Sequence, residues 1–184
     1  MNSNEQKEYQ RVAFGGGCFW CTEAVFLELK GVVNAASGYA GGTVPNSTYE
    51  QVSTGATGHA EVILVEYDPH IVSFEKLLEI FFESHDPTSL NRQGNDIGAQ
   101  YRSIILFTTL DQRVAAERFI KELADARVYD KPLVTEIAPL EAFYPAEEYH
   151  KNYYACHLDE GYSRTVIRPK IEKVIKKFPI YLKA

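Results

Sequence analysis

Cys18 is the residue best placed to do chemistry. It lies in the run Gly15-Gly16-Gly17-Cys18-Phe19-Trp20-Cys21, between a β-prone segment and a helical one. Glycines at such a junction let the backbone turn tightly and approach its neighbours closely. A thiol at a helix N-terminus feels the positive end of the helix dipole and loses its proton more easily. The pattern therefore predicts that Cys18 is a nucleophile rather than a buried cysteine that only packs.

Cys21 completes a CxxC spacing, which is typical of two other kinds of site. In thiol–disulfide oxidoreductases such a pair forms a disulfide, but Cβ atoms three residues apart on a helix lie about 5–6 Å apart, so the first turn must open. In a zinc-stabilised binding module, Cys18, Cys21, Cys156 and His157 would be the four candidate ligands. The adjacency of Cys156 and His157 is awkward for a tetrahedral site, and we expect no bound metal.

Glu61 is the candidate general acid. In a strand from Ala60 its side chain shares a face with Ile63, Val65 and Tyr67. Burial on such a face raises the pKa of a carboxyl group and keeps it able to donate a proton near neutral pH. The alternative is an exposed glutamate at the end of a strand. His59, just before it, is either a partner of this carboxyl or a loop residue.

Two polar loops supply further candidates. Asp96 lies in the segment from His85 to Tyr101, where it either orients a neighbouring group or is simply solvated. Tyr49 and Tyr101 carry phenol groups beside the two long loops and can donate hydrogen bonds to an oxygen atom in a pocket.

Hydrophobic periodicity predicts alternating strands and helices around these residues. A doubly wound sheet is disfavoured, because glycine-rich chain (38–58) rather than a helix joins the second and third strands. The order matches an α+β fold, a two-layer split βαβ sandwich with a mixed sheet and helices on one face. We expect strands at 11–14, 32–37, 60–67, 101–108 and 133–137, and helices at 19–29, 74–84, 111–126, 146–155 and 169–178.

Length and composition limit the function classes. The chain has 184 residues, 45% of them hydrophobic, which is typical of one globular domain. We expect a catalytic core at about 10–155 and a tail with a helix at 156–184. A net charge of −6 argues against nucleic-acid binding, and no apolar run approaches the roughly 20 residues that cross a bilayer. The polar opening segment lacks a signal-peptide core, which predicts a cytoplasmic protein; we expect a monomer.

Six stretches, in order and spanning nearly the whole chain, resemble the peptide methionine sulfoxide reductases of the A type. They are GGCFWC (16–21), SGYAGG (37–42), TYEQV (48–52), TGHAEVILVEYDP (57–69), HDPTSLNRQGNDIGAQYRS (85–103) and YPAEEYHKNY (144–153). The resemblance implies a ferredoxin-like α+β sandwich with additional segments.

The resemblance also implies a reaction. Cys18 would attack the sulfur of a methionine (S)-sulfoxide, free or in a protein, while Glu61 would protonate its oxygen with help from Tyr49 and Tyr101. Phe19 and Trp20 would hold the substrate methyl group, and Asp96 would hold the polar side of the site. Cys18 would become a sulfenic acid, and a second cysteine would condense with it to a disulfide that thioredoxin reduces.

The second, resolving thiol departs from the pattern of many members. Cys21 stands where they carry glycine, and Ser163 stands where related tails often carry cysteine. Cys156 is our first choice, since a tail can swing in, whereas a helical Cys21 must unwind; Cys21 is the second choice.

Overall fold

The computed structural model describes residues 8–183. A six-stranded mixed sheet with strand order β7-β6-β1-β3-β2-β8 forms its centre. All neighbouring pairs are antiparallel except the parallel pair β6–β7. The strands are β1 (Gln10–Gly16), β2 (Val32–Ala40), β3 (Ala60–Tyr67), β6 (Ser103–Phe107), β7 (Glu136–Pro139) and β8 (Phe143–Pro145), and a separate hairpin joins β4 (Arg92–Gln93) to β5 (Asp96–Ile97).

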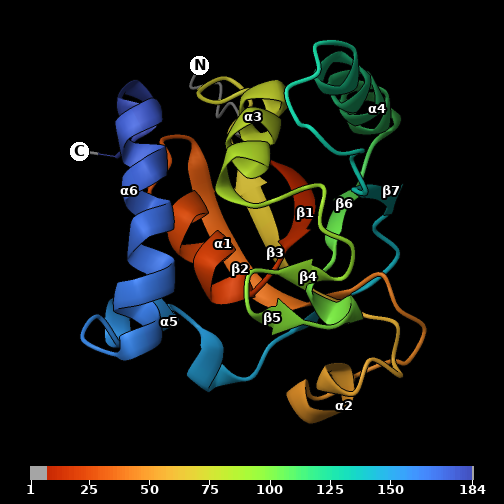
Figure 1. Cartoon of the computed structure of the whole chain (residues 1–184), viewed down its shortest axis with the longest axis vertical. Coiled ribbons are helices and arrows are strands. Elements are labelled where there is room, and N and C mark those ends of the chain that lie inside the picture. The colour runs from red at the N-terminus through yellow and green to blue at the C-terminus, as the bar shows by residue number, and fades with distance from the viewer. Residues whose placement is uncertain (1–7, 184) are drawn as a thin grey trace, which may run out of the picture.

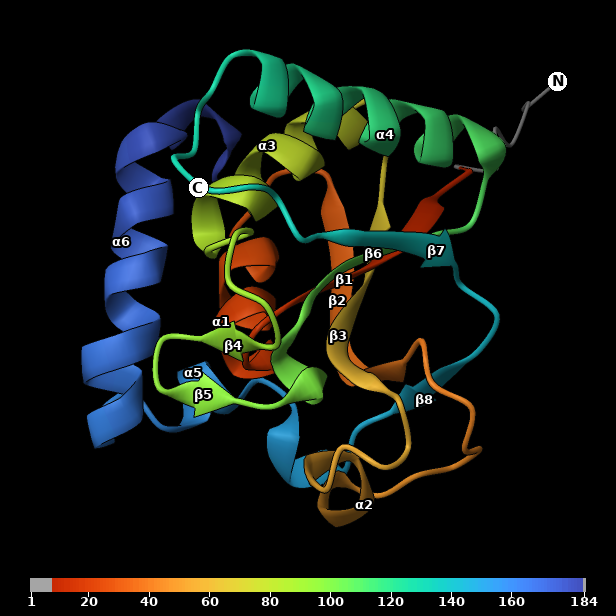
Figure 2. The ribbon, with the colours of Figure 1, turned by 45° about the vertical axis from the view of Figure 1, so that its right-hand side comes forward.

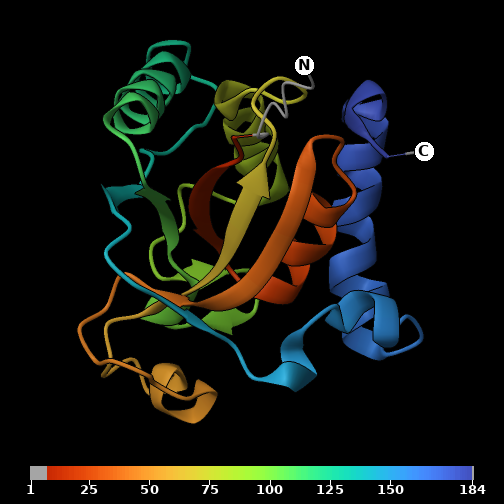
Figure 3. The ribbon, with the colours of Figure 1, turned by 180° about the vertical axis from the view of Figure 1, so that it is seen from behind.

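The main helices cover one face of this sheet. Helix α1 packs between the sheet and α6, and α3 lies beside them (Figure 1). Viewed from behind, the other face of the sheet is crossed by none of the helices formed by residues 8–183 (Figure 3). The α-helices are α1 (Phe19–Leu27), α2 (Tyr49–Ser53), α3 (Phe74–Ser84), α4 (Leu110–Asp125), α5 (Tyr153–Cys156) and α6 (Arg168–Lys177). Short 3-10 helices are η1 (Ala99–Tyr101), η2 (Glu148–His150) and η4 (Pro179–Tyr181), and η3 (Ser163–Ile167) is a π-helix that leads into α6.

The core between sheet and helices follows the sequence periodicity. In β3, Ile63, Val65 and Tyr67 point to the helix-covered side, whereas Val62 belongs to a smaller cluster on the other face. Ser73 caps α3 by accepting a hydrogen bond from the Lys76 N–H at 3.2 Å. The predicted faces of β3 and the start of α3 are therefore confirmed.

The chain departs from the predicted elements in several places. Helix α2 and the β4–β5 hairpin lie in segments expected to be loops, and the strand expected at 133–137 is β7 at 136–139. Residues 38–40, expected in a loop, extend β2 and pair with β8, which was not expected. The predicted helix 146–155 is wrong: Asn152 adopts a left-handed conformation (φ 48°) that separates the turn η2 from the short helix α5. No helix in residues 8–183 is long and apolar enough to cross a membrane. The opening residues 1–7, used for the cytoplasmic prediction, lie outside the described part.

The C-terminal segment packs against α1. Figure 2 shows α6 standing beside α1, with the β4–β5 hairpin near their lower ends. The segment carries α5, η3 and α6 along the helical layer, so residues from the end of the chain reach the turn that precedes α1.

Candidate active site

The turn between β1 and α1 fixes the position of Cys18. Gly17 has φ +94°, a conformation that favours glycine, and a Cβ atom there would lie 2.7 Å from the side chain of Gln93. Cys18 is the N-cap residue of α1 with an extended ψ of 124°, so it precedes the first helical turn. The glycine-rich turn predicted from the sequence is confirmed.

Glu61 lies beside this turn because β1 and β3 are antiparallel neighbours. The end of β1 therefore meets the start of β3. The backbone N–H of Phe19 donates a hydrogen bond of 3.1 Å to Oε2 of Glu61. The carboxyl group is 2% exposed, and burial raises its pKa to about 8. It is therefore largely protonated at neutral pH, as its predicted burial requires.

A single pocket of about 110 Å³ gathers most of the candidate residues. Its walls combine one thiol, two carboxyl groups, three phenol groups and the faces of two apolar aromatic side chains. They come from α1, α2, β3, β5, η1 and the C-terminal tail. The lining residues are Cys18, Phe19, Trp20, Tyr49, Glu61, Asp96, Tyr101 and Tyr162.

The acidity of Cys18 differs from the prediction based on the helix dipole. Burial, above all, raises the pKa of its thiol, with further contributions from a hydrogen bond with Cys21 and from the nearby Glu61. The same contact with Cys18 lowers the pKa of the Cys21 thiol to about 7. Desolvation thus outweighs the dipole, and Cys18 is a protonated thiol in the resting protein.

Tyr162, which the sequence did not single out, joins the two thiols to Asp96. Its hydroxyl lies 3.9 Å from Sγ of Cys21 and donates a hydrogen bond of 2.9 Å to Asp96 Oδ2. Burial raises the pKa of this phenol, so it stays protonated. The only sequence signal was its place beside Ser163, where related tails often carry cysteine.

His150 was also missed, and it supports the wall of the pocket. Nδ1 of His150 accepts a hydrogen bond of 3.0 Å from the indole N–H of Trp20. On its other side the indole stacks on Tyr153, with ring centroids 3.6 Å apart. His150 is buried, and burial lowers its pKa, which favours the neutral ring that this contact needs.

The other predicted residues lie outside the pocket lining. Cys21 is buried on α1 against Cys18, whereas Cys156 is exposed on α5. His59 fastens the loop after β2: Nδ1 accepts from Gly42 N–H at 3.0 Å, and Nε2 lies 2.7 Å from the Val44 carbonyl oxygen. Within residues 8–183 no group of three or more histidine, cysteine or acidic side chains is arranged to hold a metal ion.

Chemically, the pocket places a thiol beside a neutral carboxylic acid and phenol donors, in a small and partly apolar space. These functional groups are typical of a cysteine-dependent oxidoreductase, in which a thiol forms a bond to sulfur while an acid protonates an oxygen atom. A general disulfide reductase would need no such acid.

Comparisons with known proteins identify the family. Residues 10–180 match the family "Peptide methionine sulfoxide reductase". The chain is 55% identical over 165 residues to MsrA of Sulfolobus acidocaldarius, covering 90% of this chain and 93% of the relative. It is 51% identical over 174 residues to MsrA of Acinetobacter baumannii strain SDF, covering 95% and 98%.

Solved structures agree with this result. Methionine sulfoxide reductase A of Corynebacterium diphtheriae superposes with a TM-score of 0.73 at 37% identity, over 84% of this chain and 77% of that one. Reduced Mxr1 of Saccharomyces cerevisiae gives 0.78 at 31% identity, over 85% and 90%. Mxr1 in complex with Trx2, at 21% identity and a TM-score of 0.57, shares the fold.

The chain therefore belongs to the peptide methionine sulfoxide reductase family. It is an enzyme that reduces methionine sulfoxide to methionine, and the thiol–disulfide oxidoreductase alternative is not favoured.

Proposed function

We propose that the pocket around Cys18 and Glu61 is the catalytic centre for reduction of methionine (S)-sulfoxide, free or in proteins. The observation that carries this proposal is that one hollow of about 110 Å³ contains the thiol, the protonated carboxyl group and two aromatic walls. The preference for the S epimer rests on the resemblance to the A-type enzymes.

The substrate is held through its methyl group and its oxygen. Phe19 and Trp20 form the apolar side of the pocket, which accepts the methyl group. Burial raises the pKa of Tyr49 and of Tyr101, so both hydroxyl groups stay protonated and can donate to the sulfoxide oxygen. Asp96 lies on the polar side, fixed by the hydroxyl of Tyr162.

The first step transfers the oxygen to the enzyme. Glu61 gives its proton to the sulfoxide oxygen while Cys18 attacks the substrate sulfur, and the thiol proton returns the carboxylate to its acid form. This attack forms an S–S bond between Cys18 and the substrate. That bond and the substrate S–O bond then break as the hydroxyl group passes to Sγ of Cys18, and the electron pair of the S–S bond returns to the methionine sulfur. Methionine leaves reduced by two electrons, and Cys18 is left as a sulfenic acid. A general acid of this kind contributes roughly 10²–10⁴ in rate.

The second step closes a disulfide and releases water. Cys21 already contacts Cys18, and in the reduced protein the hydrogen bond with the Cys18 thiol lowers the pKa of Cys21 to about 7. The charge of Lys170 and the hydrogen bond of Tyr162, which also lower this pKa, do not depend on the Cys18 thiol proton and favour the Cys21 thiolate in this step. Cys18 lies outside the helical turn, which reduces the unwinding that a Cys18–Cys21 bond needs. These features support Cys21 as the resolving residue, whereas Cys156, favoured from the sequence, requires movement of α5.

Thioredoxin is the proposed external reductant that restores the thiols. The resemblance implies this partner, and Mxr1 of Saccharomyces cerevisiae has been solved in complex with Trx2. We also propose that the fold is the ferredoxin-like sandwich. The order β6-β1-β3-β2, all antiparallel, with α1 and α3 on one face, supports it. Packing of α6 against α1 and α3 supports a single domain over the whole chain.

One experiment tests the roles of the acid and the three thiols. A single equivalent of methionine (S)-sulfoxide is given without reductant, methionine is measured, and the new disulfide is mapped by mass spectrometry. Cys18→Ser is expected to form no methionine, and Glu61→Gln at least a hundredfold more slowly.

Wild type is expected to carry a Cys18–Cys21 bond, and Cys156→Ser to turn over fully with thioredoxin. A Cys18–Cys156 bond, with stalled turnover in Cys156→Ser, would assign the resolving role to Cys156. A normal rate in Glu61→Gln would overturn the acid role.

A further inference from the structure

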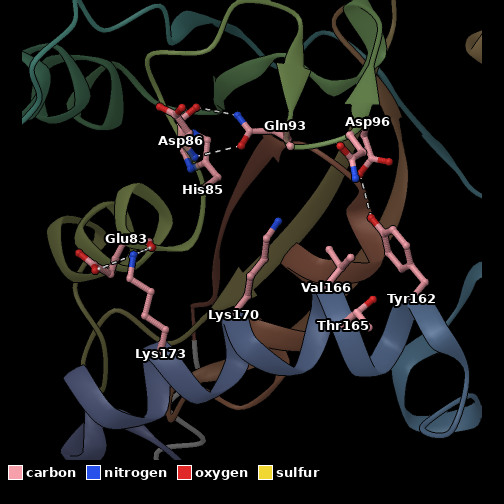
Figure 4. A pocket seen from close by; sticks show the side chains of 12 residues that line it. Glu83, His85, Asp86, Gln93, Asp96, Tyr162, Thr165, Val166, Lys170 and Lys173 are labelled. Atoms are coloured by element: carbon pink, nitrogen blue, oxygen red, sulfur yellow. Dashed lines mark hydrogen bonds and ion pairs between the residues drawn. The ribbon is translucent and has the colours of Figure 1, made fainter.

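A second, larger hollow adjoins the catalytic pocket. This cleft of about 800 Å³ lies between the end of α3, the β4–β5 hairpin and the segment from η3 to α6 (Figure 4). Asp96 and Tyr162 line both hollows, and their hydrogen bond forms the common rim. The catalytic pocket is small, about 110 Å³, and in the proposed reaction it takes the methionine sulfoxide side chain. The neighbouring residues of a bound peptide must therefore lie outside it, and the cleft is the adjoining space.

The carboxylates at the far side of this cleft already have donors. Glu83 pairs with Lys173 at 3.0 Å and also with Lys177. Asp86 accepts hydrogen bonds of 2.9 Å and 2.7 Å from the N–H and the hydroxyl of Thr88. The carboxylates of Glu83 and Asp86 thus already have partners within the protein. The carboxylate of Asp96 likewise accepts the hydrogen bond from the Tyr162 hydroxyl.

Lys170 differs from these groups. Its side chain extends from α6 into the cleft, and no hydrogen bond or ion pair joins its ammonium group to another residue within 8–183 (Figure 4). The groups that feel its charge are the Cys21 thiol and His85. Burial, with a smaller effect of this ammonium, lowers the pKa of His85 to about 4, so its ring is neutral. A half-buried cation without a counter-ion is suited to bind an anionic group that enters the cleft.

We propose that this cleft binds the residues flanking the methionine sulfoxide, and that Lys170 selects a carboxylate among them. The inference rests on the proposed function of the adjoining pocket. The carboxylate belongs either to an acidic side chain or to the C-terminus of a short peptide. Lys170 is a specificity-determining residue in this proposal, and it takes no part in the oxygen transfer.

The net charge of the protein distinguishes a specific contact with Lys170 from non-specific electrostatic attraction of peptides to the protein. A net charge of −6 repels acidic peptides at long range. That repulsion is screened beyond about 8 Å at physiological ionic strength, whereas a contact pair in a partly buried cleft is screened less. General electrostatics therefore favours basic peptides, and the cleft favours acidic ones.

The test uses the full chain and single-turnover methionine formation, which precedes disulfide closure, and it compares peptides within each variant. Amidated peptides carry methionine (S)-sulfoxide flanked by glutamate, alanine or lysine, and a fourth has alanine flanks with a free C-terminus. Wild type is expected to reduce the glutamate peptide about fivefold more efficiently than the alanine peptide, the size of one ion pair. Lys170→Met should abolish this ratio, taken against the alanine peptide of the same variant, and Lys170→Glu should reverse it. A preference for the free C-terminus alone assigns the subsite to that carboxylate.

Lys176→Glu is the matched control. Lys176 lies in the last turn of α6 and does not line the cleft, yet its substitution changes the net charge equally. It should keep the wild-type preference. The proposal is wrong if Lys176→Glu shifts the preference as Lys170→Glu does, or if Lys170→Met changes all peptides by one factor. Failure of wild type to reduce even the alanine peptide would instead overturn the proposed function.

Discussion

The indole N–H of Trp20 donates a 3.0 Å hydrogen bond to Nδ1 of His150. Trp20 lines the proposed catalytic pocket, and His150 is buried behind it. The contact leaves the ring proton on Nε2, which has no hydrogen-bond partner among residues 8–183 and lies 3.8 Å from the Glu147 carboxylate. The position of the Trp20 side chain in the pocket wall is thus supported by a histidine that itself lies outside the pocket lining.

His150→Phe should raise the KM for methionine sulfoxide about fivefold, with a smaller change in kcat. The substitution keeps a ring in place and removes one hydrogen bond, which contributes about 1 kcal/mol. Trp20 is the only tryptophan in the sequence, so its fluorescence emission should shift in the same variant. The exposed His70 provides the control, His70→Asn. Unchanged emission and KM in His150→Phe would contradict a positioning role.

Glu61 should make the protein less stable as the pH rises. Its pKa is about 8 in the fold and about 4.3 in an unfolded chain. The stabilisation by the protonated form is therefore fully present below about pH 4.3 and is lost as the pH rises through about 8. Urea unfolding at pH 6 and pH 9 should show that Glu61→Gln gains several kcal/mol relative to wild type over this interval. Parallel pH profiles of the two proteins would show that this carboxyl has an ordinary pKa.

Gly17→Ala should destabilise the fold and slow oxygen transfer. A methyl group must adopt φ +94° and would lie 2.7 Å from the Gln93 side chain. We expect a loss of about 2–3 kcal/mol in unfolding free energy, from strain and overlap together. Gly55→Ala is the matched control, because Gly55 has φ +77° but no atom within 4 Å of the added carbon. Its expected loss is about 1 kcal/mol. Equal losses in both variants would show that contact with Gln93 costs nothing.

Tyr162→Phe should slow disulfide closure more than methionine formation. The hydroxyl of Tyr162 is among the groups that lower the pKa of Cys21, after its hydrogen bond with Cys18. Its removal should raise the pKa of Cys21 above about 7 and reduce closure at pH 7 by about threefold to tenfold. Rapid-quench measurement of methionine and free thiols against pH separates the two steps. An equal effect on both would place Tyr162 in the oxygen transfer instead.

The elements that hold the reactive groups follow from local patterns. Strand β3 spans Ala60–Tyr67 as predicted, because the β-branched and apolar run is bounded by polar turns. Helix α3 begins after Ser73, whose cap is a local signal. The convergence of Cys18, Glu61 and the loop residues Tyr49, Asp96 and Tyr101 on one pocket agrees with the resemblance to the reductase family.

The features that could not be predicted from the sequence depend on tertiary contacts. Residues 38–40 pair with β8 because glycine at position 38 leaves room for the Phe143 ring, which a Cβ would approach to 2.4 Å. The segment near His150 does not form the predicted continuous helix, and this irregular path places His150 and Tyr153 against Trp20. The pKa of Cys18 depends on burial by distant residues, which a local dipole argument does not include.

The antiparallel pairing of β1 with β3 has one more consequence. The paired residues run from Gln10 opposite Tyr67 to Phe14 opposite Ile63, and Cys18 and Glu61, the proposed nucleophile and acid, lie just beyond the last pair. Their separation is set by hydrogen bonds across two adjacent strands, not by the forty or so residues of chain that connect them. A change of chain length at Gly55, where no atom lies within 4 Å of an added Cβ atom, is therefore expected to leave the spacing of Cys18 and Glu61 unaltered.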